Sequence, residues 1–437
     1  MLTSSLTNLF LSYIHIIIPS VIIVSLGIFA QRIFFPWRKA QVHGFCTPEF
    51  ETVRDIFRSN FDKGWEEEGA SFAVYHKGRL VVDLWGGFME KKCYRVWKKD
   101  TMTCLFSLTK SVGALCLALL VDRGLCNYDD KISKFWPEYA KNGKEDTTIA
   151  MVLEHRTGLP YFDRNVIKED LDDPARMRKL IEDEKPKYKI GTNIAYHALT
   201  YGWILDSLFQ SIDPNKRNVG QFIKEELHKK HNLDIHMGNC PVEEFRVARL
   251  AKPSFWLMFW EFLSYPISML RSLIMVALSG GTAMRAFRNI APFGVALFSD
   301  NNPYIGSNNA DFRQWSQPAF NGIGTARALA ELYVKAFEGG LLSKELVEIF
   351  KEPTQLNKFD YTLGDVQHKG RGFFYYRSPT GSWKIGHFGI GGQTAHYDFD
   401  NQLSIVYLCN GMKLGILDFV KTYNRLEQKI YESLTTT

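Results

Sequence analysis

The sequence predicts an α+β fold in which one antiparallel sheet, flanked by helices, is built from both ends of the chain. Runs of β-branched and aromatic residues occur early, within residues 70–85, and return only late, within residues 372–408. The chain between them has helical periodicity and polar loops. Strands at both ends with helices between them are typical of α+β proteins, so we predict a helical region inserted into a single sheet.

Composition and charge narrow the class of protein. The 437 residues are 46% hydrophobic and 23% charged, as in an ordinary globular protein, and the net charge is only +6. No block of Lys and Arg forms a nucleic-acid footprint, so no nucleic-acid partner is expected. The seven cysteines contain no CxxC pair, which argues against a zinc ribbon or a disulfide scaffold. We predict no metal and no organic cofactor.

An apolar segment near the start of the chain predicts a membrane anchor. Leu9–Ala30 carries no charged residue, and its 22 residues would extend about 33 Å as a helix, enough to span a bilayer. A cleaved signal peptide has a basic start and small residues before its cleavage site. Here the start of the chain is uncharged, and Ile28 stands where a small residue would be needed. We predict a retained single-pass anchor over residues 1–35. Basic residues follow the segment, which places the globular part on the cytoplasmic side of the membrane.

Residues 36–437 are predicted to form one catalytic domain. Ala70–Tyr75 and Arg79–Trp85 flank His76-Lys77-Gly78 and indicate a β-hairpin. Apolar residues with helical spacing predict a helix over Ser107–Arg123, ended by Gly124. The later elements are strands over Gly372–Arg377, Trp383–Ile385 and Leu403–Leu408, and a helix over Ile416–Leu434.

A second apolar insertion covers residues 250–290. Its most apolar part, residues 255–278, is interrupted by Glu261, Pro266 and Arg271, and two charges near the middle would be costly inside a bilayer. A second span is therefore not expected. Three interpretations stay open for this insertion: a helix on a membrane surface, a lid over a pocket, or a buried pair of helices.

Ser107-Leu108-Thr109-Lys110 is the sharpest chemical motif. Residues three apart share one face of a helix, so the Lys110 amine can reach the Ser107 hydroxyl. A lysine held in a desolvated site loses its proton more easily and can then act as a base toward serine. The alternative is a structural role without catalysis, in which Ser107 caps the start of the helix and Lys110 is solvated.

Two later segments strengthen the chemical interpretation. Tyr196-His197-Ala198 leads into an apolar helix, and Gly386-His387-Phe388-Gly389-Ile390 lies between two strands. The order Ser-x-x-Lys, Tyr, His-x-Gly resembles the class C β-lactamase and penicillin-binding-protein superfamily, and within it the family VIII carboxylesterases and eukaryotic serine β-lactamase-like proteins. Further blocks share the resemblance: Asp83–Gly87, Leu153–Pro160, Gly324–Ala330 and Asn410-Gly411-Met412.

The resemblance implies a β-lactamase/transpeptidase-like fold, and it also implies a role for each residue that matches the family's motifs. Ser107 would be the acylated nucleophile, and Lys110 and Tyr196 would form the base pair that moves its proton. His387 would stand where the lactamases have the lysine of Lys-Thr-Gly. Gly389 and Ile390 would face the substrate oxyanion, which the N–H groups of Ser107 and Ile390 would bind.

Two departures from the family pattern bear on the substrate. Ala198 replaces an asparagine that contacts the substrate amide, and His387-Phe388-Gly389 removes a fixed positive charge. Both favour a neutral small-molecule ester or amide over an antibiotic. Phe388 and the apolar segment 255–278 suggest that the acyl group is apolar. A peptidase and a catalytically weak scaffolding protein of the same fold stay open as alternatives. The histidines at His228, His231 and His236 lack an acidic or thiol partner at metal-site spacing, so a solvated helix surface is expected there.

Overall fold

The computed structural model describes residues 19–20, 40–238, 244–266, 270, 274, 281–288, 306–415 and 419–435. The chain divides into two units, Met1–Ala40 and Gln41–Thr437. The anchor predicted for residues 1–35 lies outside the described residues except at Pro19 and Ser20. Within the described ranges, no helix combines the length and the apolar character that a membrane span requires.

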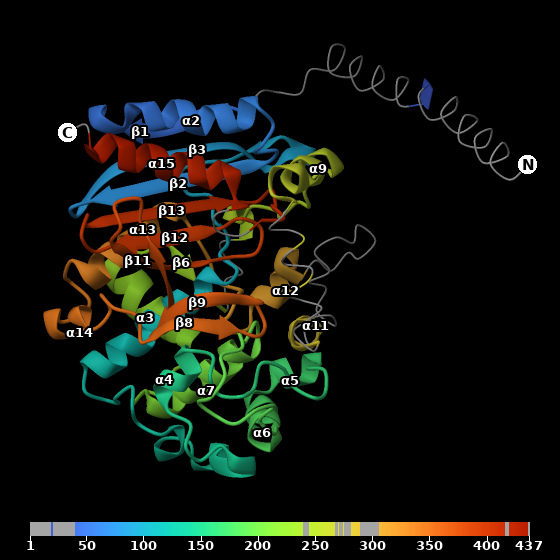
Figure 1. The fold of residues 1–437 in the computed structure, drawn as a ribbon, viewed down its shortest axis with the longest axis vertical. Coiled ribbons are helices and arrows are strands. Elements are labelled where there is room, and N and C mark those ends of the chain that lie inside the picture. The colour runs from blue at the N-terminus through green and yellow to red at the C-terminus, as the bar shows by residue number, and fades with distance from the viewer. Residues whose placement is uncertain are drawn as a thin grey trace, which may run out of the picture. The chain divides into compact units, whose positions relative to one another are not determined.

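One antiparallel sheet dominates the second unit (Figure 1). Its strand order is β1-β3-β2-β13-β12-β11-β10-β9-β8, with the short β4 paired to β3. This order confirms the predicted sheet, because β2 from the early part of the chain pairs directly with β13 from the late part. The strands are β1 Val42–Cys46, β2 Gly69–His76, β3 Arg79–Glu90, β4 Arg95–Val96, β8 Gln355–Asp360, β9 Asp365–Gly370, β10 Phe373–Arg377, β11 Trp383–Phe388, β12 Thr394–Asp398 and β13 Leu403–Cys409.

The β2–β3 hairpin forms where the sequence predicts it. Lys77 and Gly78 connect the two strands, and both have positive φ, 49° and 72°. Two residues with positive φ suit the right-handed twist of a tight hairpin, and glycine adopts that conformation without a steric cost. His76 consequently pairs with Arg79 across the turn.

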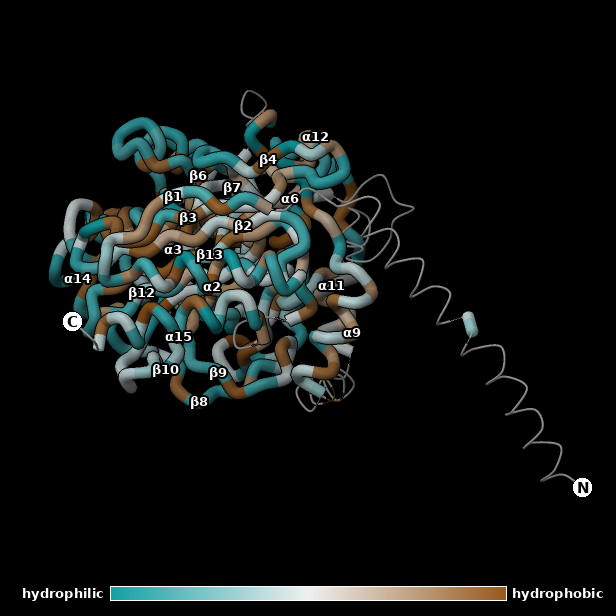
Figure 2. Tube along the Cα trace, turned by 90° about the horizontal axis from the view of Figure 1, so that it is seen from above, coloured by the Kyte–Doolittle hydropathy of each residue, from teal (hydrophilic) through white to brown (hydrophobic). Residues whose placement is uncertain are grey.

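The sheet carries a hydrophobic core on each face. Along β2, Phe72 and Val74 point into one core, while Ala73 and Tyr75 point into the other. The first core is covered by α2 (Glu51–Asp62) and α15 (Lys421–Thr435), which lie together beside the sheet in Figure 1. On the second face, α13 (Ala326–Phe337) packs against β2 and β13, and α3 (Leu108–Asp122) packs against β10 and β11. Figure 2 shows hydrophobic residues along these central strands.

The inserted helical region follows α3. Its helices are α4 Ile149–Leu153, α5 Lys168–Asp172, α6 Pro174–Asp183, α7 Thr200–Ile212, α8 Val219–Phe222, α9 Phe255–Ser264, α11 Thr282–Arg288 and α12 Ala310–Arg313, and α14 Lys344–Glu348 comes after α13. A small second sheet, β5 (Thr103–Cys104), β7 (Ile323–Gly324) and β6 (Ile235–His236), joins the region to the chain before α3.

Most predicted helix bounds hold, with one correction. The helix α3 begins at Leu108, and Gly124 follows it with a φ of +71°, as expected for a stop. The C-terminal helix, predicted over Ile416–Leu434, spans Lys421–Thr435, and residues 416–418 lie outside the described residues. Val420 precedes the helix and is fully buried in the core beneath α2 and α15.

Candidate active site

Ser107 lies at the start of α3, directly after a strained backbone turn. Phe106 has a φ of +46°, which is rare for a bulky residue, and its side chain is held by packing against Cys104, Leu250 and Met412. Strain of this kind persists only where the surroundings fix it, and it occurs often at functional sites. The turn leaves Ser107 at 8% exposure, beside the first turn of the helix.

Lys110 is fully buried one turn further along α3. Its Nζ lies 3.4 Å from Ser107 Oγ and donates hydrogen bonds to the carbonyl oxygens of Ala198, at 2.9 Å, and Ala319, at 2.8 Å. Burial holds the pKa of Lys110 well below its usual range, and the charge of Lys369 adds to that effect. A neutral amine has two N–H bonds and one lone pair. The two carbonyls take both N–H bonds, which leaves the lone pair for the Ser107 hydroxyl.

Tyr196 lies against the same lysine. The Lys110 Nζ is 4.8 Å from the centre of the Tyr196 ring. The Tyr196 hydroxyl is buried and has no hydrogen-bond partner among the described residues. Burial raises the pKa of Tyr196, and the nearby Ser107 hydroxyl partly opposes that rise. The structure therefore brings together the three residues that the sequence motifs singled out.

His387 lies on β11 with its ring centre 6.1 Å from that of Tyr196. Its Nδ1 is 2.8 Å from the carbonyl oxygen of Phe388, which can only accept, so Nδ1 carries the proton. Burial holds the pKa of His387 well below its usual range. The imidazole is thus neutral at pH 7, and β11 presents no fixed positive charge at this position.

Gly389 and Ile390 form the turn after β11 and face the loop that leads to Ser107. A Cβ on Gly389 would lie 3.0 Å from the carbonyl oxygen of Leu105, so only glycine permits this approach without displacement. The Gly389 N–H donates to Gln393, whose side chain donates to the carbonyl of Cys104. Within the described chain, the N–H groups of Ser107 and Ile390 find no acceptor. One donor lies at the start of α3 and the other in the turn after β11, and Gly389 brings these two segments close together, as an oxyanion site requires.

A buried ion pair beneath Tyr196 was not predicted from the sequence. Lys369 on β9 and Asp360 at the end of β8 are both almost completely buried, and their charged groups are in direct contact. Asp360 Oδ1 also accepts the backbone N–H of Tyr196 at 3.0 Å. Neither residue belongs to a recognisable motif, and the strands that hold them are largely polar, so the sequence offers no signal for this pair.

Two histidines beside Tyr196 serve the local structure. His155 Nδ1 accepts the N–H of His197 at 3.1 Å, and its ring centre lies 4.7 Å from that of Tyr196. The His197 ring lies 2.7 Å from Thr157 Oγ1 and 2.5 Å from the carbonyl oxygen of Ala195. These contacts fix the loop that carries Tyr196, so both histidines have a structural role.

The histidine cluster formed by the π-helix Ile223–Lys229 and β6 differs from the solvated helix surface predicted for it. His228, Asp234 and His236 place one ligand atom each within 4.8 Å of one another, so an acidic partner is present after all. The Asp234 carboxylate, however, pairs with Arg246 and also contacts His236 Nε2 at 2.9 Å. The two oxygens of Asp234 are therefore already bound to Arg246 and His236.

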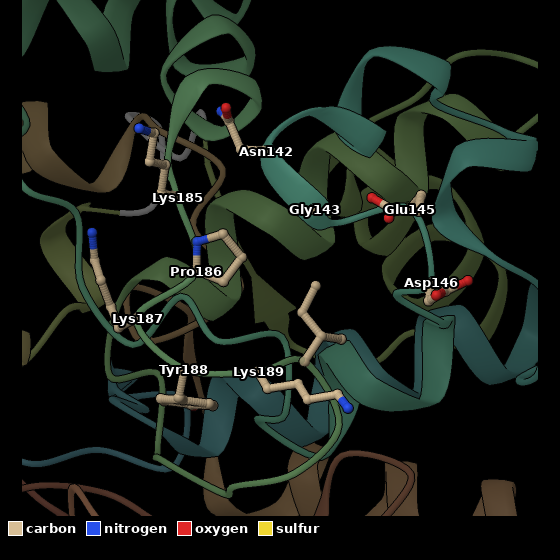
Figure 3. Close-up of a pocket in the computed structure, with 10 residues that line it drawn as sticks. Asn142, Gly143, Glu145, Asp146, Lys185, Pro186, Lys187, Tyr188 and Lys189 are labelled. Carbon is tan, nitrogen blue, oxygen red and sulfur yellow. The ribbon is translucent and has the colours of Figure 1, made fainter.

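An open hollow lies on the helical region (Figure 3). Residues 142–146, apart from Lys144, line one side, and residues 185–190, with three lysines, line the other. None of the residues predicted for the active site lines it. The hollow is thus separate from the group around Ser107.

The fold and the Ser107–Lys110–Tyr196 group define a class of protein, the serine hydrolases that work through an acyl-enzyme. The family model Beta-lactamase matches residues 57–429, and the chain therefore belongs to the beta-lactamase family. It is similar to the Esterase/beta-lactamase LipL of Mycobacterium tuberculosis, with 28% identity over 89% of this chain and 88% of that protein.

Solved structures show the same relationship. A family VIII carboxylesterase is 26% identical, with a TM-score of 0.76, over 90% of this chain and all of that one. A penicillin-binding protein homologue from Caulobacter crescentus is 28% identical, with a TM-score of 0.74, over the same shares of both chains. The resemblance inferred from the motifs is confirmed, and the chain is a serine hydrolase of this family.

Proposed function

We propose that this enzyme hydrolyses small neutral esters, with Ser107 as the nucleophile and Lys110 as the general base. The observation that carries the proposal is the environment of Lys110, whose two N–H bonds are taken by Ala198 and Ala319. The lone pair accepts the Ser107 proton as Oγ attacks the ester carbonyl. The negative charge that forms on the carbonyl oxygen meets the N–H groups of Ser107 and Ile390.

Collapse of the tetrahedral intermediate breaks the ester bond. The alcohol leaves with the proton taken from Ser107, delivered through Lys110 or the Tyr196 hydroxyl, and the acyl group stays on Oγ. Water then attacks the acyl-serine, passes its proton to the same pair and releases the acid. The sequence departures at Ala198 and His387 support a substrate without a carboxylate.

An apolar acyl group fits the side chains beside the site. Tyr196, Ala198, Phe374 and Phe388 form one buried apolar cluster, with Leu363 packed against it. Contact with this cluster would remove the hydrocarbon of the acyl group from water, which gains about 25 cal/mol per Å² of apolar area. Beside the cluster, position 387 of β11 offers a neutral, buried histidine and no fixed charge that would bind an anionic substrate.

Labelling with a fluorophosphonate tests the role of Ser107. We expect one adduct on the intact protein, formed as Oγ displaces fluoride, and no adduct on Ser107→Ala. Ser111→Ala is the matched control, because Ser111 lies one turn further along α3 and its hydroxyl donates to the carbonyl of Leu108. This control should label normally. An adduct that persists in a folded Ser107→Ala protein would refute the assignment.

We also propose that residues 1–35 anchor the enzyme in a membrane, with the catalytic domain on the cytoplasmic side. The uncharged Leu9–Ala30 segment supports this proposal. So does α9, where Phe255, Trp256 and Trp260 are 69%, 53% and 59% exposed, which suits a helix lying at a bilayer surface. The proposal favours a membrane surface over a buried helical pair for this part of the 250–290 insertion.

Fractionation of cells tests the anchor. We expect the full chain to sediment with membranes through a carbonate wash, and a chain starting at Gln41 to be released by it, because the anchor alone resists that wash. Protease added to sealed vesicles should degrade the domain only when the cytoplasmic face is outward. Full release of the intact chain by carbonate would contradict the anchor.

A further inference from the structure

We propose that the buried Asp360–Lys369 pair is a positioning device for the active site, in which Asp360 holds Tyr196 in place and Lys369 keeps Lys110 in its neutral form. The inference rests on the proposed function, in which Lys110 is the base. It assigns a role to two residues outside the Ser107, Lys110 and Tyr196 motifs.

Asp360 is built to hold the loop that carries Tyr196. One of its oxygens, Oδ1, accepts three backbone N–H groups, from Tyr196 at 3.0 Å, Thr362 at 2.9 Å and Leu363 at 3.0 Å. The backbone of Ile194 also forms a parallel bridge with Asp360. A fully buried carboxylate with these partners fixes the loop against the end of β8, and a shift of that loop would move the Tyr196 hydroxyl away from Ser107.

Lys369 supplies the counter-charge and reaches further into the site. Its Nζ contacts Asp360 Oδ2 and lies 5.6 Å from the centre of the Tyr196 ring and 4.7 Å from that of Phe374. The Lys110 amine lies near the same ring, with its Nζ 4.8 Å from the ring centre. Lys110 and Lys369 are both buried, and between buried groups a positive charge acts more strongly than it would at the surface.

The other groups that face Lys110 carry little charge of their own. His387 comes from β11, His155 and His197 from the loops beside Tyr196, and Tyr201 from α7. The histidines are buried and their pKa values are lowered, so all three are neutral at pH 7. Among these described neighbours, the Asp360–Lys369 pair is the charged group, and loss of Lys369 would leave only the acidic half.

The experiment compares pH profiles of kcat/KM for p-nitrophenyl butyrate in wild type, Lys369→Met and the double variant Asp360→Asn/Lys369→Met. Methionine keeps the length of the side chain and removes the charge. The double variant avoids leaving a buried carboxylate without its partner. The acid limb of the profile reports the base of the free enzyme.

We expect the acid limb to move to higher pH by about one unit in Lys369→Met, equal to a roughly tenfold loss of kcat/KM at a pH below the limb. The double variant should move the limb in the same direction but by less, because it removes the negative charge of Asp360 together with the positive charge of Lys369. The matched control is Lys384→Met/Glu427→Gln. It removes another buried ion pair, 2.6 Å long, which joins β11 to α15 on the opposite face of the sheet. This control should leave the limb in place.

A merely structural role predicts a different result. If the pair only stabilises the fold, the variants would lose kcat at every pH while the acid limb stays within about 0.3 units of the wild type, and that outcome would overturn the proposal. Labelling of Ser107 by fluorophosphonate separates this failure from failure of the proposed function. An enzyme that labels at Ser107 but shows an unmoved limb keeps its function and loses only the role assigned to Lys369.

Discussion

At the scale of single residues, the surroundings of Lys110 explain why a serine three positions away becomes reactive. The motif spacing predicts that the two side chains meet, and they do, at 3.4 Å. The carbonyls of Ala198 and Ala319 could not be predicted, because a backbone oxygen leaves no trace in residue identity. Asp360 and Lys369 escape prediction for a related reason, since a lone acid and a lone lysine in polar strands look like surface residues.

The buried histidines make the stability of the fold dependent on pH. Burial lowers the pKa of His197 to about 4, against about 6.5 in an unfolded chain. Below pH 6.5 the unfolded chain therefore binds a proton that the folded chain does not, so the free energy of unfolding falls as the pH drops toward 4. For His197 alone the loss is about 3 kcal/mol at pH 4.

Urea unfolding of wild type and His197→Gln at pH 7.5, 6.5, 5.5 and 4.5 measures this contribution. Burial raises the pKa of Asp206 to about 7, and this shift changes the stability with pH in the opposite direction. The pH dependence of the free energy of unfolding is therefore compared between the wild type and the variant, so that the contribution of Asp206 cancels. We expect a shallower loss of stability toward acid pH in the variant. Equal slopes would show that His197 is not held neutral in the folded protein.

At the scale of elements, the turn between β11 and β12 depends on the absence of a side chain at Gly389. An alanine there would place its Cβ 3.0 Å from the Leu105 carbonyl and 3.1 Å from Phe106 Cβ, so the turn would have to move away from Ser107. We expect Gly389→Ala to lower kcat roughly 10- to 100-fold, because Ile390 N–H would no longer face the oxyanion correctly.

A matched glycine separates displacement of the turn from general crowding. Gly411→Ala creates contacts of 3.2–3.3 Å, but these are with the side chains of Glu66 and Glu68 and not with the loop that leads to Ser107. Steady-state kinetics and thermal melting of both variants should show normal turnover for Gly411→Ala and melting temperatures close to wild type for both. Full activity in Gly389→Ala would mean that the turn does not contribute to the oxyanion site.

The elements differ in how well their sequences predict them. The hairpin at residues 69–90 and the strand β13 alternate between two buried faces, and such β-branched runs are easy to recognise. β8, at the edge of the sheet, is exposed at Leu356–Phe359 and lacks an apolar alternation. Its pairing with β9 is set by tertiary contacts such as the Asp360–Lys369 pair, which no local pattern reveals.

At the scale of the whole molecule, the predicted plan of one sheet with an inserted helical region holds. The plan could be inferred because apolar strands cluster near both ends of the chain. The order of the nine strands in the sheet could not be inferred. Strands β8 to β13 pair in the order in which they follow one another in the chain, but β1, β3 and β2 join them through the distant pairing of β2 with β13, which no local pattern indicates. The active site shows the same division. The motifs predicted Ser107, Lys110 and Tyr196, but they did not predict Asp360 and Lys369, which lie beneath them.

The pairing of β2 with β13 has a consequence for how the protein is made. His76 lies opposite Leu403, so almost the whole domain must be synthesised before the centre of the sheet can close. Until then one edge of the β2–β3 hairpin presents unpaired backbone groups, a template for association with other chains. Non-local pairing of this kind also slows folding. We therefore expect the centre of the sheet to form only after β13 has emerged from the ribosome, with the nascent chain dependent on chaperones until then.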